Sequence, residues 1–551
     1  MDTLSVFSFL GFTLLVAFIA WYSTRKTDES SADGYYLAGR SLGTVTIAGS
    51  LLLTNLSAEQ IVGLNGQSFA QGVLVMAWET LAAISMIVTA IYLLPKYMRS
   101  GITTIPEFIQ ERFDAQTKSI LSVLFLIAFG IVLLPTILYS GSLAFSTMFN
   151  LPDMLGVSQS VVIWICVWSI GIIGSIYAIF GGLKAVAVSD LVNAIGLLIG
   201  GLLIPVFGLI FIGDGSMSSG VIELWNENPD KFNAKGEIDS FIPFSTIFTG
   251  MMIAQMYYWG TNQSILQRVF GAKSLADGQK GMILAGFVKF LIPIIVVLPG
   301  VIAWHVFGND LSNADQAYPA LVRQVLPEAF LGFFAAVLFG AILSSFNSLL
   351  NSSSTLFGVD LYRQYFDNNA SEKKTVYAGK IFGFILAIIS MTISPFIANA
   401  PEGLFSYIQE SLGSLSVPIL AVVCVGMFNK KVPAFAAKIA LFGGVILYLI
   451  SQFVLSPHMV ATALAEATSN GITDPKALSL IRATAYPHFL HIMGILFVLN
   501  VGFMLLMGKI YPNKNIYVPK LTDDIDITPW KYAKVVGVII TFLVLSTYFI
   551  F

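Results

Sequence analysis

The stretch Leu51-Leu-Leu-Thr-Asn-Leu-Ser-Ala-Glu-Gln60 decides how the rest of the chain is organised. It lies within residues 45–66, an apolar segment long enough to cross a bilayer. Polar groups at membrane depth are costly unless they face protein, water or an ion. We therefore predict a helix that breaks near Asn55 and turns its freed carbonyl groups toward a cation. The alternative is a continuous helix whose polar face packs against its neighbours. The polar side chains of the stretch are Thr54, Asn55, Ser57, Glu59 and Gln60.

The composition is that of a membrane protein. Of 551 residues, 56% are apolar and 11% are charged, whereas soluble proteins carry about 25% charged residues. The net charge of −2 offers no basic surface for a nucleic acid. Cys166 and Cys424 fall in apolar segments, so no disulfide framework is expected. The first apolar segment has neither a basic start nor a small-residue cleavage site, so we interpret it as a membrane helix and not as a signal peptide.

Fourteen apolar segments are long enough to be membrane helices. They span approximately residues 5–22, 45–66, 73–98, 119–148, 160–178, 186–212, 241–264, 280–307, 327–360, 375–397, 403–428, 434–455, 488–508 and 533–550. With the N-terminus outside, the inner connections hold 23 of the 29 Lys and Arg residues, the outer ones hold five, and Lys289 lies within a helix. Basic residues concentrate in inner connections. The sequence thus predicts an all-α polytopic protein in a lipid bilayer, with both termini outside.

The connections carry little that points to other chemistry. Residues 213–240 and 308–326 are expected to be solvated outer loops, with short helices over an entrance as the alternative. No Gly-Lys-Ser/Thr phosphate loop occurs, which disfavours an ATP-driven pump. His488 and His491 lack an obvious third ligand and are interpreted as interfacial residues. No nucleophile–base set is found, so an enzyme is not expected.

Charged residues recur inside other apolar segments. Glu79 and Lys289 have opposite signs on separate helices. They are predicted to meet, either in a structural salt bridge or in a ligand site. Asp190 lies near a helix start, where it is either a cap or a functional acid. Residues 255–263 contain Gln, Tyr, Trp, Thr and Asn side chains and predict a second break.

Hydroxyl and amide side chains follow one face of a further helix. Ser344, Ser348 and Asn351 have the spacing of one helical face. Such serines either let helices approach closely or supply oxygen ligands to a hard cation, for which Ser344 and Ser345 are the candidates. Together with the polar residues of segment 403–428, these clusters predict a hydroxyl-rich ligand and a small cation held at mid-membrane.

The two predicted breaks are five helices apart and lie in helices of opposite direction. This is the arrangement of two inverted five-helix repeats, as in LeuT-type transporters. Repeat one is placed at residues 45–212 and repeat two at residues 241–428. Residues 1–44 then form a first helix with its inner loop, and residues 434–551 form three peripheral helices.

Several long motifs, in order and spread over essentially the whole chain, resemble the sodium/solute symporter family, and most of all its bacterial sodium/galactose branch. The motifs are Asn55-Leu-Ser-Ala-Glu-Gln60, Ile105-Pro-Glu-Phe108, Tyr257-Tyr-Trp-Gly-Thr-Asn-Gln263 with Gln267-Arg268, Lys289 with Val297-Leu-Pro-Gly300, Ser344-Ser345 through Asp360-Leu-Tyr362, and Tyr407-Ile-Gln-Glu410. The resemblance implies sodium as the coupling ion and a multi-pass protein of the bacterial inner membrane, monomeric or weakly oligomeric.

The resemblance also implies roles for individual residues. The expected sodium ligands are the carbonyl groups of Leu53, Leu56 and Ala341 and the hydroxyls of Ser344 and Ser345. The expected sugar ligands are Gln60, Glu79, Gln255, Lys289 and Gln409, with Tyr258 stacking on the sugar as an inner gate. The expected outer gate is Leu64, Trp78 and Phe405. A second sodium site or a release path is expected at Asp190, Asn347 and Ser348.

Three positions depart from the galactose branch. That branch has Asn, Ser and Asn where this chain has Leu133, Ala82 and Gln255. Two polar partners are thereby lost, so the identity of the sugar stays open. The function expected is sodium-coupled import of a monosaccharide or polyol by alternating access. The alternatives are a sodium-coupled symporter for an amino acid or organic acid, and a sensor or channel, although no soluble output module is present.

Overall fold

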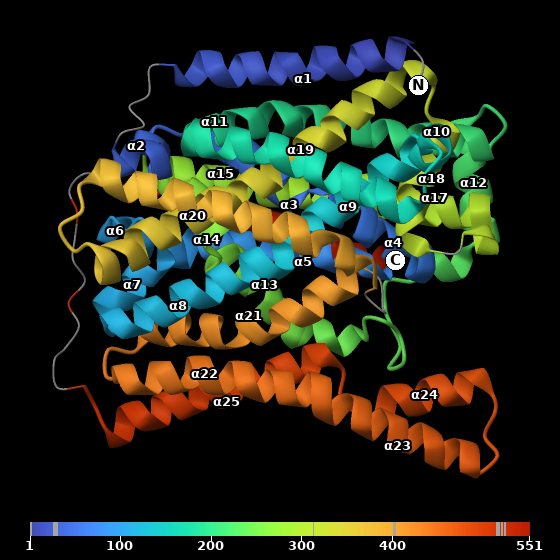
Figure 1. The fold of residues 1–551 in the computed structure, drawn as a ribbon. Coiled ribbons are helices and arrows are strands. Elements are labelled where there is room, and N and C mark those ends of the chain that lie inside the picture. The colour runs from blue at the N-terminus through green and yellow to red at the C-terminus, as the bar shows by residue number, and fades with distance from the viewer. Residues whose placement is uncertain are drawn as a thin grey trace.

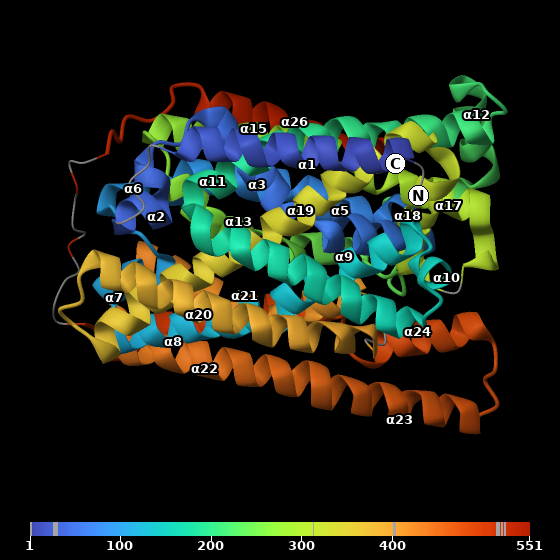
Figure 2. The same cartoon turned by 45° about the horizontal axis from the view of Figure 1, so that its top comes forward.

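The long helices of the computed structural model run side by side in one bundle (Figures 1 and 2). The structure describes residues 3–25, 31–311, 313–399, 404–513, 518, 522 and 525–551. The elements of the first half are α1 Thr3–Thr24, α2 Ala32–Leu37, η1 Ala38–Arg40, α3 Thr44–Asn55, η2 Glu59–Gly63, α4 Leu64–Gln71, η3 Gly72–Met76, α5 Ala77–Val88, η4 Thr89–Leu93, α6 Leu94–Ser100, α7 Ile105–Arg112, α8 Ala115–Ile127, η5 Ala128–Leu133, α9 Leu134–Met148, α10 Leu151–Leu155 and α11 Gln159–Ile212.

The second half adds α12 Met217–Glu227, η6 Pro229–Phe232, η7 Phe244–Phe248, α13 Gly250–Gly260, α14 Gln263–Phe270, α15 Leu275–Leu291, α16 Pro293–Val296, α17 Leu298–Phe307, η8 Gly308–Asp310, η9 Ala314–Gln316, α18 Ala317–Val325, α19 Glu328–Thr355, η10 Leu356–Phe366, α20 Glu372–Ile393, η11 Ser394–Asn399, α21 Leu404–Phe428, α22 Ala434–Ile450, η12 Ser451–Leu455, α23 Ser456–Ser469, α24 Pro475–Ala485, α25 Phe489–Ile510 and α26 Ala533–Ile550. The elements η2, η4, η5, η10 and η12 are π-helical turns.

Twelve helical stretches of the described chain are long and apolar enough to cross a membrane. The chain is therefore a multi-pass, all-helical membrane protein. Of the fourteen predicted segments, 45–66 and 241–264 do not form such stretches, because the structure interrupts both of them. Only α3 remains of the first as a shorter apolar helix, while its second part continues into the stretch Glu59–Ser100.

The first interruption follows α3. Leu56 has a non-helical backbone, with φ −80° and ψ 64°. The Ser57 amide then bonds the carbonyl of Asn55 instead of that of Leu53, so the Leu53 carbonyl loses its helical donor. The predicted break near Asn55 is confirmed.

The second interruption separates α13 from α14. Thr261 leaves the helix, and the Asn262 side chain caps α14 by accepting from the Ser264 amide at 2.9 Å. Asn favours this position because its short side chain satisfies an orphan amide of the first helical turn. The predicted break within residues 255–263 is confirmed.

Gly182 divides α11 into two stretches, 159–176 and 182–212. Its φ of 55° and ψ of −177° interrupt the helical backbone, and a Cβ there would lie 3.2 Å from the Tyr35 ring. Glycine suits the position on both grounds. Asp190 lies about two turns beyond this kink, inside the helix. It is therefore not the helix cap that its place in the sequence allowed.

The helices at the centre of the bundle are mostly buried, whereas those at its edge are exposed. In the stretches Glu59–Ser100 and Phe330–Phe366, 83% of the most apolar window is buried, against 11% in Phe7–Thr24 and 28% in Ala533–Ile550. Figure 1 shows α1 and the α22–α25 helices along opposite outer edges. Exposed apolar helices of this kind suit contact with lipid.

Both ends of the described chain lie at the same end of the bundle (Figures 1 and 2). The helices α12, α18 and α24 cover that end, whereas α2, α6 and α7 lie at the other. The expectation of solvated loops at 213–240 and 308–326 is thus wrong, because α12 and α18 form there. α18 buries one apolar face, whereas α12 buries only Gly220 and Leu224.

Candidate functional site

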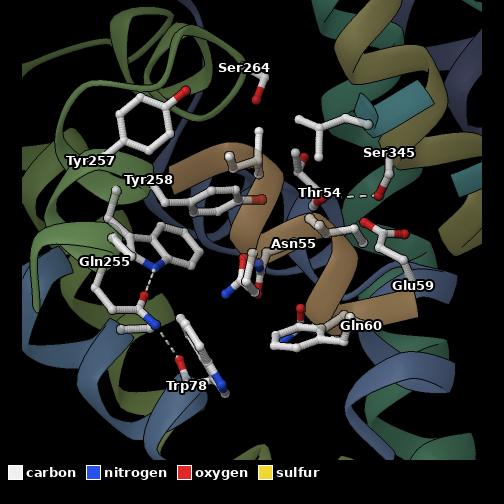
Figure 3. A pocket seen from close by; sticks show the side chains of 18 of the residues that line it. Thr54, Asn55, Glu59, Gln60, Trp78, Gln255, Tyr257, Tyr258, Ser264 and Ser345 are labelled. Atoms are coloured by element: carbon white, nitrogen blue, oxygen red, sulfur yellow. Dashed lines mark hydrogen bonds between the residues drawn. The ribbon is translucent and has the colours of Figure 1, made fainter. Parts of the chain in front are cut away.

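A cavity of about 90 Å³ lies between the first helix break and the helices α5, α13, α15, α19 and α21. It has room for roughly six or more water molecules, and so for a small solute. Figure 3 shows its side chains converging from the two interrupted helices and their neighbours. Its polar and aromatic lining residues are Thr54, Asn55, Glu59, Gln60, Trp78, Glu79, Gln255, Tyr257, Tyr258, Trp259, Ser264, Lys289, Ser345, Phe405, Gln409 and Ser416.

The two charges predicted to meet do so at the cavity wall. Lys289 donates to one carboxylate oxygen of Glu79, and the Gln60 amide donates to the other. The Glu79 and Lys289 side chains are each 1% exposed. In a buried pair of this kind the attraction between the two charges offsets part of the cost of removing each from water. The three residues come from α5, α15 and η2, so the pair joins elements that are far apart in sequence.

The two remaining glutamines differ in how they are held. Gln255 donates to the Trp78 carbonyl at 2.7 Å and accepts from the Trp259 indole at 3.1 Å. Both ends of its amide are therefore engaged within the protein. Gln409 lines the same cavity, and none of the described residues hydrogen-bonds its side chain. The Gln409 amide is thus free to bind a ligand and the Gln255 amide is not. The sequence alone predicted the same role for both.

Three of the four expected gate residues line the cavity. The rings of Trp78 and Phe405 meet edge to face with centroids 5.5 Å apart. Tyr258 reaches from α13 toward the end of α3 (Figure 3). Leu64 is fully buried in α4 but does not line the cavity.

The five expected sodium ligands lie where α19 passes the first break. The Ser345 hydroxyl is 3.3 Å from the Leu53 carbonyl oxygen and 3.0 Å from that of Thr54. The Ser344 hydroxyl is buried without a hydrogen-bond partner. Oxygens left unsatisfied in a buried site fit a hard cation. Leu56 and Ala341 are buried at 2% and 0% exposure.

A second oxygen cluster lies deeper. One Asp190 oxygen accepts from Ser50 at 2.6 Å, and the other has no hydrogen-bond partner, as has the Asn347 side-chain oxygen. Ser348 accepts a hydrogen bond from the Arg268 guanidinium. Arg268, which the charge count placed in a connection, is fully buried. A cation bound at Ser348 would compete with this guanidinium, because like charges repel strongly where water is excluded.

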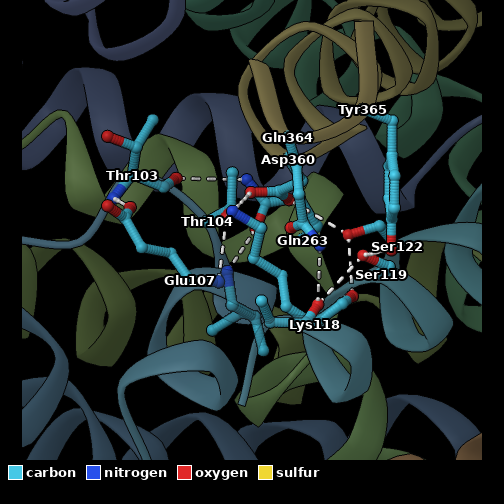
Figure 4. A network of polar contacts seen from close by, with 12 residues as sticks. Thr103, Thr104, Glu107, Lys118, Ser119, Ser122, Gln263, Asp360, Gln364 and Tyr365 are labelled. Carbon is cyan, nitrogen blue, oxygen red and sulfur yellow. Dashed lines mark hydrogen bonds and ion pairs between the residues drawn. The ribbon is translucent and has the colours of Figure 1, made fainter. Parts of the chain in front are cut away.

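A separate buried network was not predicted (Figure 4). Asp360, fully buried, accepts from Thr104 at 3.0 Å and from Ser122 at 3.2 Å, and its carboxylate lies 3.7 Å from the Lys118 ammonium. Gln263 accepts from the Ile105 amide nearby. Three motifs of the resemblance meet here, although nothing in their spacing connects them.

Two departures from the galactose branch, Leu133 and Ala82, line the cavity with apolar groups. The expected interfacial histidines are hydrogen-bonded to neighbouring residues, His488 to the Phe241 carbonyl and His491 to Ser245 and Thr249. A group that the sequence did not suggest, Glu223, Glu227 and His305, brings its ligand atoms within 4.8 Å of one another, outside the cavity.

Comparison with known proteins adds a family and relatives. The sodium:solute symporter family matches residues 35–446. The chain is 42% identical over 548 residues to an Escherichia coli protein named uncharacterized symporter YidK, covering 100% of this chain and 91% of that protein. It is 31% identical over 519 residues to the sodium/glucose cotransporter of Vibrio parahaemolyticus, covering 87% of this chain and 93% of that one.

The fold also has a counterpart among solved structures. A Na⁺-coupled sialic acid symporter, in a substrate-bound outward-open state, superposes with a TM-score of 0.68. The match covers 91% of this chain and 98% of the other, at 19% sequence identity. At this identity the likeness establishes a shared fold.

Proposed function

Because the chain belongs to the sodium:solute symporter family and is thus a sodium-coupled solute symporter, we propose that its solute is a neutral monosaccharide or polyol, imported by alternating access. The observation that carries the proposal is the cavity wall of Gln60, Glu79, Lys289 and Gln409. Amides, a carboxylate and an ammonium together offer both donors and acceptors, which suits a ligand with several hydroxyl groups.

The aromatic residues support the same solute. Tyr258 offers a flat face to the cavity, and Trp78 with Phe405 forms an apolar contact in the same wall. A pyranose ring has apolar C–H faces that pack on aromatic rings, while its edge carries the hydroxyls. A relative named a sodium/glucose cotransporter supports the assignment independently.

We place one sodium ion at Leu53, Leu56, Ala341, Ser344 and Ser345. The unpartnered Ser344 hydroxyl and the Ser345 hydroxyl beside the Leu53 carbonyl support this position. One sodium ion moving down about 100 mV and a tenfold gradient releases about 3.7 kcal/mol, which sustains on the order of 500-fold accumulation of a neutral solute. We assign Asp190, Asn347 and Ser348 to the release path and not to a second site, because Arg268 already occupies the Ser348 oxygen.

The finer architecture is part of the proposal. We propose fourteen membrane crossings, with inverted repeats at residues 45–212 and 241–428 and three peripheral helices in 434–551. The two helix breaks, at Leu56 and Thr261, support this division because they lie at corresponding helices of the two repeats. Both chain ends at one end of the bundle agree with an even number of crossings.

A second candidate is a sodium-coupled symporter for an amino acid or organic acid. Its carboxylate would need a free cation at the cavity wall. Of the described residues that line the cavity, Lys289 is the only Lys or Arg, and it is engaged with Glu79. The neutral solute is favoured for this reason.

The test is uptake into proteoliposomes. Radiolabelled glucose, galactose and myo-inositol are offered with an inward sodium gradient and with choline in its place. We expect sodium-dependent accumulation of at least one of the three, and competition from the other hydroxyl-rich solutes. Sodium-dependent uptake of an amino acid or organic acid, with none of the three sugars moving, would overturn the sugar assignment.

A further inference from the structure

Among the described residues that line the cavity, Glu59 is the charged residue that the ion pair does not involve. The Asp, Glu, Lys and Arg residues of this described lining are Glu59, Glu79 and Lys289. Lys289 and Glu79 offset each other. Glu59 accepts a hydrogen bond from the Ser57 hydroxyl, and no Lys, Arg or His in the described part of the chain forms an ion pair with it. With Glu59 ionised, the wall carries one net negative charge.

The hydrogen-bonding capacity of the wall is also unbalanced. Three donors are bonded within the protein, since Gln60 and Lys289 both donate to Glu79 and Gln255 donates to the Trp78 carbonyl. The Gln409 amide and the Trp78 indole N–H have no partner among the described residues, but both are neutral donors. The unengaged acceptors include a charged group. The Glu59 carboxylate has a single hydroxyl partner, and the buried Asn55 side-chain oxygen has none.

This inventory separates solutes by charge. A hydroxyl both donates and accepts, and an ammonium donates, so either can use the unsatisfied oxygens of Glu59 and Asn55. A carboxylate only accepts. It would face the Glu59 carboxylate, and the donors left to it, the Gln409 amide and the Trp78 indole, carry no charge to offset the repulsion, which is screened less in the cavity than in bulk water.

We propose that Glu59 determines charge specificity: it admits neutral and cationic hydroxyl-rich solutes and rejects those that carry a carboxylate. The inference rests on the proposed function for the hydroxyl-rich class of solute. Glu59 lies next to Gln60 in η2, at the break itself, so it acts from a part of the wall that is close to the expected sodium ligands as well.

The first experiment uses three solutes with one pyranose ring: glucose, glucosamine and glucuronate. Each competes against the neutral sugar that gives sodium-dependent uptake. In the wild type we expect glucuronate to compete on the order of tenfold less well than glucose. In Glu59→Gln we expect glucuronate to compete better than in the wild type and glucosamine to compete less well. The competition by glucose should change least. Glu466→Gln, an exposed carboxylate on α23, is the matched control and should leave all three unchanged.

A purely structural role of Glu59 would not produce opposite changes for glucuronate and glucosamine. If Glu59 only held the break in shape, Glu59→Gln would weaken all three competitors together, and the inference would be wrong. Equal competition by glucose and glucuronate in the wild type would overturn it as well.

A second experiment needs no knowledge of the solute. Ala254 lines the cavity, and Ala254→Cys places a thiol there in a background lacking Cys166 and Cys424. We expect a cationic ethylammonium thiosulfonate to react with this thiol faster than its anionic sulfonate analogue. Glu59→Gln should reduce the ratio of the two reaction rates several-fold. If the ratio falls but no sugar is taken up, the charge role of Glu59 stands and the proposed function fails. If a sugar is taken up and neither the ratio nor the competition changes in Glu59→Gln, the proposed function stands and the inference fails.

Discussion

The Gln60 amide donates a hydrogen bond to Glu79, whose other carboxylate oxygen is held by Lys289. Both oxygens of Glu79 are therefore engaged before a solute arrives. Each carboxylate oxygen can accept two hydrogen bonds, so a sugar hydroxyl can bond Glu79 beside the Gln60 amide or in exchange for it, and exchange leaves Gln60 free to bond the solute in turn. Lys289 is the fixed partner, since its side chain is 1% exposed and has little room to move.

Removing the charge of Glu79 should destabilise the protein as well as stop transport. In Glu79→Gln, Lys289 stays buried without its anion, and breaking a buried pair in this way costs about 3–5 kcal/mol. The double variant Glu79→Gln with Lys289→Met should recover most of the melting temperature but no uptake. Thermal unfolding in detergent and uptake in proteoliposomes check the two effects. A double variant no more stable than the single one would contradict the pairing.

The cavity glutamines Gln255 and Gln409 should give opposite results. Gln409→Ala removes an amide that no described residue bonds, so we expect a 5- to 150-fold weaker half-saturation for the sugar and an unchanged melting temperature. Gln255→Ala deprives the Trp78 carbonyl and the Trp259 indole of partners, so the melting temperature should fall. Wild-type sugar affinity in Gln409→Ala would place the sugar elsewhere.

Sodium dependence should identify the ion site and its stoichiometry. In Ser345→Ala and Ser344→Ala a dehydrated cation loses an oxygen ligand, so half-saturating sodium should rise on the order of tenfold. The wild type should follow a Hill coefficient near one. Ser390→Ala, on α20 and bonded to the Gly130 and Leu386 carbonyls, is the control with unchanged sodium affinity. A Hill coefficient near two would argue for a second ion at Asp190.

Orientation can be tested with a pair of exposed lysines from opposite ends of the bundle. Lys476 begins α24, at the end where both termini lie, and Lys373 begins α20 at the other end. In a background without Cys166 and Cys424, Lys476→Cys should react with an impermeant thiol reagent in intact cells. Lys373→Cys should react only after permeabilisation. The reverse pattern would place the termini inside.

Acidification should loosen the contact between α8 and α22. Partial burial raises the pKa of Asp114, but bonds from Lys438 at 2.7 Å and from Thr117 outweigh it and hold the pKa below its usual value. A carboxyl with a depressed folded-state pKa stabilises the fold above its unfolded pKa, near 3.8, and this contribution is lost as the pH falls further. Asp114→Asn should therefore lower the melting temperature at pH 7, and the difference should shrink toward pH 3. A pH-independent difference would exclude the ionised pair as its cause.

The helix breaks were predictable because their cause is local. Asn and Ser in an apolar segment compete for backbone hydrogen bonds wherever the segment folds. The pairing of Glu79 with Lys289 was predictable for a similar reason, since isolated opposite charges at membrane depth have few other partners.

Contacts set by tertiary structure were not predictable. From the sequence, Arg268 is predicted to be a basic residue of a connection. Only the packing of α14 against α19 shows that it is buried and donates a hydrogen bond to Ser348. The engagement of Gln255 depends on the Trp78 carbonyl, a backbone group that side-chain patterns do not reveal. Asp360 likewise accepts hydrogen bonds from Thr104 and Ser122, and both of them are more than two hundred residues from Asp360 in sequence.

The π-helical turns have a consequence for how specificity can change. Glu59 and Gln60 lie in η2, and Leu133 ends η5. A π turn holds one residue more than an α turn, and each residue of an α-helix advances the side chains by roughly 100°. Deleting one residue from either turn would restore an α-helix there and change which side chains of that turn face the solute. Libraries of single-residue deletions and insertions in these two segments would therefore reach binding sites that amino-acid substitution alone does not.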